Sequence, residues 1–114
     1  MGDSDQAQER RNHPRIRVRI ESQLVGPGGK VRGHLLDLSA GGAYLSTPRS
    51  LPIGTGVHLS IPRGAARNPL ELDAEVVRIG GPREGRIAGL GLRFLGLSPL
   101  ESELLQAILS SAAA

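Results

Sequence analysis

The stretch Asp37-Leu38-Ser39-Ala40-Gly41-Gly42 interrupts two runs of strand-forming sequence, and the rest of the chain is organised around it. Asp37 and Ser39 lie two residues apart, so if the strand continues to Ser39 both side chains leave the same face, a carboxylate beside a hydroxyl. Gly41 and Gly42 allow the backbone to turn with positive φ and allow a ligand to approach closely. The composition is that of a binding turn, although the stretch taken alone also fits an ordinary hairpin turn whose Asp and Ser bond to their own backbone.

Extended segments lie on both sides of this turn. The apolar alternation of the longest one slips at Val77, which indicates a β-bulge. Gly89 and Gly91 inside the last segment indicate a tight bend or the close approach of another backbone. Because an open antiparallel sheet leaves exposed edges, these short strands favour closure into a six-stranded antiparallel β-barrel. The strands are predicted over residues 15–22, 30–39, 43–46, 56–61, 70–79 and 87–94.

A helix is predicted at the end of the chain, over residues 98–112, so the fold class is mainly β with one C-terminal α-helix. Ser98, Pro99 and Glu101 form a capping box with proline at the first helical position. We expect the apolar stripe of this helix to pack against the open end of the barrel, with a helix-to-helix dimer contact as the alternative. The stripe consists of Leu100, Leu104, Leu105, Ile108 and Leu109.

The N-terminal region divides into a polar tail over residues 1–8, which we expect to be disordered, and an arginine-bearing arm over 9–15. Pro14 disfavours a helix here, so Arg10, Arg11 and Arg15 are predicted on an extended arm that could fold over an anionic ligand. Arg17 and Arg19 alternate with apolar residues and are predicted to form the solvated face of the first strand. Residues 9–112 then make one domain, with the barrel over 15–95.

Composition narrows the possible functions. The 114 residues fit a single domain, and the absence of cysteine excludes disulfides and thiolate metal sites. The three histidines are isolated in sequence, so no metal site is expected. The pI of about 10.5 comes from thirteen arginines and one lysine. Arginine forms bidentate contacts to phosphate and guanine, which favours an anionic or nucleotide-like partner, although genomic base composition can also raise the arginine content.

Hydropathy bears on location. No apolar run approaches the roughly 18 residues needed to span a bilayer. The polar, acidic N-terminus is unlike a signal peptide. We therefore expect a cytoplasmic protein without a membrane partner.

The order and spacing of two motifs match those of a known protein family. The arm Arg11-Asn12-His13-Pro14-Arg15 followed by Asp37-Leu38-Ser39-Ala40-Gly41-Gly42 resembles the Arg-x-x-x-Arg and Asp-x-Ser-x-x-Gly signatures of the PilZ domain, a bacterial cyclic di-GMP receptor module. The strand Gly89-Leu90-Gly91-Leu92-Arg93-Phe94 is similar to the Gly-x-Gly-x-x-Phe pattern of that family. The resemblance covers roughly residues 9 to 112 and implies a PilZ-type barrel.

The resemblance also implies ligand contacts. Arg11 and Arg15 match arm arginines that contact phosphate and the Hoogsteen edge of guanine. Asp37 and Ser39 match residues that hydrogen-bond the other guanine, and Gly42, beside Gly41, matches the glycine that permits the turn. In the family, an arginine immediately before the first motif arginine accompanies binding of two intercalated ligand molecules. Arg10 occupies that place, which predicts a dimeric ligand.

By this resemblance the chain is expected to be a stand-alone adaptor, monomeric or a weak homodimer, that changes its contact with an unidentified downstream protein when cyclic di-GMP binds. A small basic barrel that binds nucleic acid is the first alternative, although two aromatic residues are too few for a base-stacking platform. A nucleotide-independent protein scaffold is the second. An enzyme is not expected, because Ser39 has no histidine nearby in sequence. Whether the ligand also touches Arg63, Arg67, Arg78 or Arg93 is left open.

Overall fold

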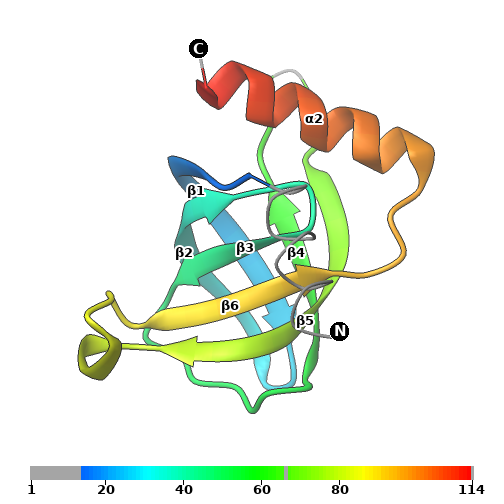
Figure 1. Ribbon diagram of the computed structural model, residues 1–114. Helices are drawn as coiled ribbons and strands as arrows, with labels where there is room; N and C mark the ends of the chain where they lie inside the picture. The colour runs from blue at the N-terminus through cyan, green and yellow to red at the C-terminus, as the bar shows by residue number, and fades with distance from the viewer. Residues whose placement is uncertain (1–13, 66, 114) are drawn as a thin grey trace, which may run out of the picture.

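Six antiparallel strands close into a barrel in a computed structural model that describes residues 14–65 and 67–113. Neighbouring strands follow the order β1-β2-β3-β6-β5-β4, and the helix α2 lies across one end of the barrel (Figure 1). The predicted fold class is confirmed. The elements are β1 (Ile16–Gly26), β2 (Gly29–Leu38), β3 (Gly42–Ser46), β4 (Gly56–Ile61), β5 (Leu70–Gly80), the 3₁₀ turn η1 (Pro82–Glu84), β6 (Gly89–Phe94) and α2 (Pro99–Ala113).

The first hairpin is longer than the sequence predicted. β1 continues past Ser22 to Gly26, where it pairs with Gly29 across a two-residue connection. Gly28 in that connection has φ 91°, a conformation that glycine adopts without strain. Arg17 and Arg19 are exposed on β1, so their predicted outward orientation is confirmed.

Bulges and glycines bend the sheet into a closed barrel. The β5–β6 register shifts between Val76 and Arg78, which confirms the bulge predicted at Val77. A Cβ on Gly89 would lie 2.2 Å from the carbonyl oxygen of Leu45 on β3, so close backbone approach is also confirmed there. A second shift, between Leu35 and Asp37 in the β2–β3 pairing, lies just before the turn that carries the first motif residues.

The apolar core fills the barrel and continues under α2. Leu105 and Leu109 of the helix are buried, whereas Leu104 and Ile108 are partly buried against the same core. This packing uses the predicted apolar stripe within the chain itself. Leu100 is different, because 63% of it is exposed in the first turn of the helix, and its assignment to the buried stripe was wrong.

The predicted capping box is present at the start of α2. Ser98 donates its backbone N–H to Glu101 Oε1 over 2.8 Å, and Glu101 returns its N–H to Ser98 Oγ over 3.1 Å. Within residues 14–65 and 67–113, the structure contains no helix with the length and hydropathy of a membrane span.

Candidate functional site

The connection between β2 and β3 is organised by the hydroxyl of Ser39. This oxygen accepts the N–H groups of Gly41 and Gly42, each over 3.1 Å, and lies 3.3 Å from the Gly42 carbonyl oxygen, to which it donates. A hydroxyl has one donor and two acceptor positions, so all of them are used. Ser39 directly follows Leu38, the last residue of β2, and is only 4% exposed. The structure therefore gives Ser39 the self-bonded turn geometry that was one of the two sequence interpretations.

The two glycines of the turn serve a different purpose from the one predicted. Neither Gly41 nor Gly42 has positive φ, so that expectation was wrong. Gly42 is needed because β6 passes so close that a Cβ would lie 2.2 Å from the carbonyl oxygen of Leu92. The carbonyl of Gly41 accepts the N–H of Phe94 over 2.9 Å. Both glycines therefore fasten the turn to β6.

Asp37 lies between two arginines at the mouth of this turn. Its Oδ1 accepts a hydrogen bond from Nη1 of Arg15 over 3.2 Å, and its Oδ2 lies 3.6 Å from Nη2 of Arg86. The side chain of Asp37 is 15% exposed, against 53% for Arg15 and 34% for Arg86. The group as a whole carries a net charge of +1 and presents guanidinium N–H donors beside a carboxylate, a combination suited to an anionic ligand with polar edges.

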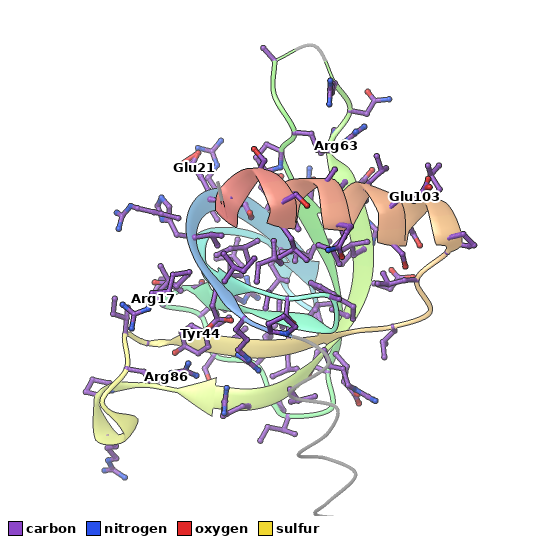
Figure 2. All side chains as sticks on the ribbon, turned by 45° about the horizontal axis from the view of Figure 1, so that its top comes forward. Arg17, Glu21, Tyr44, Arg63, Arg86 and Glu103 are labelled. Carbon is purple, nitrogen blue, oxygen red and sulfur yellow. The ribbon has the colours of Figure 1, made fainter. Side chains whose placement is uncertain are left out.

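Arg86 is the residue that sequence reasoning missed. It follows η1 in the β5–β6 connection, and its guanidinium carbon lies 4.4 Å from the centroid of the Tyr44 ring. Figure 2 shows the two side chains next to one another at this side of the barrel. Asp37 and Tyr44 are cross-strand partners in the β2–β3 pairing, so a cation stacked on Tyr44 also lies near Asp37. No motif signals this relationship, because it arises from the pairing of strands.

Tyr44 gives Arg86 a fixed platform. The ring is 2% exposed, and its hydroxyl donates to the carbonyl oxygen of Ile87, the residue after Arg86. Gly80 makes room for it, since a Cβ at that position would lie 2.4 Å from the hydroxyl. The backbone N–H of Arg86 is itself bonded to Gly81 O over 3.0 Å. The guanidinium is therefore held by packing on a buried ring.

In the part of the chain that the structure describes, the other arginines considered as ligand contacts are not seen beside Asp37. Arg10 and Arg11 lie outside the described residues, as does the predicted tail. Arg93 pairs with Glu75 over 2.6 Å on the outside of the sheet. Arg78 is exposed and is the cross-strand partner of Gly91 in the β5–β6 pairing.

Arg63 and Arg67 are the other two arginines whose contact with the ligand was left open. They line a pocket of about 360 Å³ that includes neither Arg15 nor Asp37. Arg63 also donates from Nε to the carbonyl oxygen of Asn68 over 2.7 Å, within its own loop. Of the predicted site residues that the structure describes, it brings Arg15, Asp37, Ser39, Gly41 and Gly42 to one place, and it adds Arg86.

Comparisons with known proteins find solved structures with the same fold. The PilZ domain of YcgR from Escherichia coli, solved with c-di-GMP, superposes with a TM-score of 0.72 at 25% identity, covering 91% of this chain and 92% of that one. A longer YcgR structure in complex with c-di-GMP from the same organism gives a TM-score of 0.72 at 28% identity, covering 90% of this chain and 45% of that one.

A further solved structure shows the same fold at lower identity. The PilZ domain of CeSA from a cellulose-synthesizing bacterium gives a TM-score of 0.68 at 20% identity, covering 89% of this chain and 99% of that one. No curated protein matches the sequence. The family model described as the PilZ domain matches residues 9–111, and the chain belongs to this family.

Proposed function

We propose that this chain is a receptor for cyclic di-GMP and that it binds the dinucleotide between the arginine arm and the Asp37 turn. The observation that carries the proposal is the Asp37 carboxylate held between Arg15 and Arg86 at the mouth of the turn. The likeness to a YcgR PilZ domain whose structure holds c-di-GMP supports the same ligand.

The chemistry of the ligand matches the groups at the site. Cyclic di-GMP offers two phosphodiesters, which suit the forks of Arg11 and Arg15, and two guanines with O6 and N7 acceptors. A carboxylate such as Asp37 suits the N1 and N2 donors of guanine. Because Asp37 is only 15% exposed, a guanine reaches it by replacing an arginine contact, and Arg15, 53% exposed, is the one that exchanges most easily.

The turn residues act as the frame of this site. Ser39, Gly41 and Gly42 fix the chain direction after Asp37 and fasten it to β6, so they set the position of the carboxylate. In this proposal the contribution of Ser39 to binding is made through the turn, because its hydroxyl already uses its hydrogen-bonding positions.

The stoichiometry follows from the arm. Arg10 directly precedes Arg11, the position that in PilZ domains accompanies two intercalated ligand molecules. We therefore propose that the chain binds a dimer of cyclic di-GMP. Two molecules bring four phosphodiester charges, and a third arm arginine beside Arg11 and Arg15 supplies a further cation to balance them.

Signalling is proposed to work through a partner protein. In this proposal the arm lies over the bound ligand, and the exposed surface that a partner contacts changes with binding. The chain acts as an adaptor and does not hydrolyse the dinucleotide.

Isothermal titration with cyclic di-GMP tests the proposal, with GTP as the ligand control. The wild type should bind with a stoichiometry near two, and Arg11→Ala should weaken binding about ten- to a hundredfold, the value of one charge-assisted hydrogen bond. Arg19→Ala is the matched control, because Arg19 is an exposed arginine on the outer face of β1. Salt-sensitive oligonucleotide binding that persists in Asp37→Ala, without binding of cyclic di-GMP, would favour a nucleic-acid function instead.

A further inference from the structure

Arg86 has hydrogen-bond donors that no acceptor within residues 14–65 and 67–113 uses. Its Nη2 lies 3.6 Å from Asp37 Oδ2, within ion-pair range but longer than a hydrogen bond. Among the described residues, no other side chain or carbonyl accepts from its guanidinium. Arginine carries five N–H donors in a planar fork, so this fork is able to bind a ligand atom next to the carboxylate.

The position of the fork is fixed before any ligand arrives. The guanidinium stacks on the buried ring of Tyr44, and the side chain of Arg86 is 34% exposed, so one part of the fork is covered and another faces solvent. A preorganised donor loses little conformational freedom on binding and therefore discriminates between ligands more sharply than a mobile one.

The guanine edge has the complementary order of groups. N2 and N1 are donors and O6 is an acceptor, in that sequence along one edge. If N1 and N2 donate to the carboxylate of Asp37, the neighbouring O6 can accept from a cation beside that carboxylate, the place that Arg86 occupies. Adenine has an amino donor where guanine has O6, and it would face the N–H groups of that cation with no acceptor.

We propose that Arg86 is a specificity-determining residue that donates to O6 of the guanine bound by Asp37. Asp37 and Arg86 together would then recognise the donor, donor and acceptor groups of one guanine edge. This inference rests on the proposed cyclic di-GMP function and adds a residue from the β5–β6 connection, outside the two motifs.

The test compares Arg86→Ala with Arg83→Ala, which removes the same charge from an exposed position in η1 of the same connection. Binding of cyclic di-GMP is measured by isothermal titration, and cyclic di-AMP is measured as a competitor. Arg86→Lys keeps the charge and removes the fork. Thermal unfolding of all three variants establishes that each is folded.

We expect Arg86→Ala to weaken binding of cyclic di-GMP about tenfold or more, the value of one hydrogen bond to a charged group. Arg83→Ala should change it less than about threefold, as expected for an exposed charge. Binding of cyclic di-AMP should change little in Arg86→Ala, so the preference for guanine over adenine falls. Arg86→Lys should recover only part of the loss.

Two other outcomes would overturn the inference, and they differ from failure of the proposed function. If the wild type binds but Arg86→Ala resembles Arg83→Ala, Arg86 is not a ligand contact. If Arg86→Ala weakens binding of cyclic di-GMP and of cyclic di-AMP equally, the residue acts as a counter-charge to phosphate and does not recognise the base. If the wild type itself does not bind cyclic di-GMP, the proposed function fails and this inference fails with it.

Discussion

Nη1 of Arg15 donates to Oδ1 of Asp37 over 3.2 Å, which joins the end of the N-terminal arm to the end of β2. These are one residue from each of the two PilZ motifs. The pair is partly exposed, so its own contribution to stability is small, on the order of 1 kcal/mol or less. In the proposed function the pair matters for binding, because a ligand that takes either group must exchange partners with the other.

Asp37→Asn should weaken binding of cyclic di-GMP by about ten- to a hundredfold. The amide keeps the shape but replaces the charged acceptor, and a hydrogen bond to a charged group contributes about 1.5–3 kcal/mol. Isothermal titration measures the change, with Asp73→Asn as the control, because the Asp73 carboxylate lies on β5 and bonds to His58 of β4. Equal affinity of wild type and Asp37→Asn would exclude the carboxylate from the site.

Gly42→Ala should destabilise the fold by about 1–3 kcal/mol, as overpacking does elsewhere. The added Cβ would lie 2.2 Å from the Leu92 carbonyl oxygen, which belongs to the backbone of β6 and cannot rotate away. Chemical denaturation measures the loss. Gly56→Ala is the control, since a Cβ there meets no atom within 4 Å and Gly56 has no positive φ. It should be neutral or slightly stabilising, and equal effects of the two changes would contradict the close approach.

Leu105→Ala should cost about 2–5 kcal/mol of unfolding free energy, because it removes a side chain only 1% exposed where α2 meets the barrel. Leu100→Ala lies one turn earlier in the same helix, is 63% exposed, and should change stability by about 0.5 kcal/mol or less. Urea denaturation of both variants measures the difference. Comparable losses would mean that the helix packs through a different face.

His58 should make stability depend on pH. Hydrogen bonds to Asp73, over 3.0 Å from Nδ1, and to Glu71, over 3.0 Å from Nε2, raise the pKa of His58 above its usual 6.5. A raised pKa in the folded state stabilises the protein fully below the unfolded pKa, and that stabilisation is lost as pH rises through the folded value.

The stability difference between wild type and His58→Gln should therefore be larger below pH 6.5 than well above it. Denaturation at several pH values gives the difference, and an NMR titration of the imidazole gives the pKa directly. Because the side chain is 41% exposed, solvent screening keeps the effect small. A titration midpoint below the usual value would contradict the bridging geometry.

Features set by neighbouring residues were predictable from the sequence. The capping box of Ser98 and Glu101 needs only residues three apart, and the bulge at Val77 is visible as a break in alternation. The place of Asp37 beside a glycine turn was also visible. The positive φ expected at Gly42 was wrong because the requirement for glycine comes from β6, a strand about fifty residues later, and not from the turn itself.

Side-chain contacts between residues that strand pairing brings together were not predictable. Arg86 stands in a glycine-rich connection with no periodicity, and its meeting with Asp37 depends on β3 lying between β2 and β6. Tyr44 on β3 makes the link. It is the cross-strand partner of Asp37 on β2, and its ring supports Arg86 of the β5–β6 connection. The roles of Arg10 and Arg11 stay predictions, since both precede the described residues.

Equilibrium dialysis of the full chain against labelled cyclic di-GMP tests the central claim most directly, because it counts bound ligand without relying on heat or on a conformational signal. We predict saturable binding near two nucleotides per chain, resistant to excess GTP and reduced in Asp37→Asn. Absence of saturable binding by folded wild-type protein would contradict the receptor function, and saturation at one nucleotide would contradict the dimeric ligand alone.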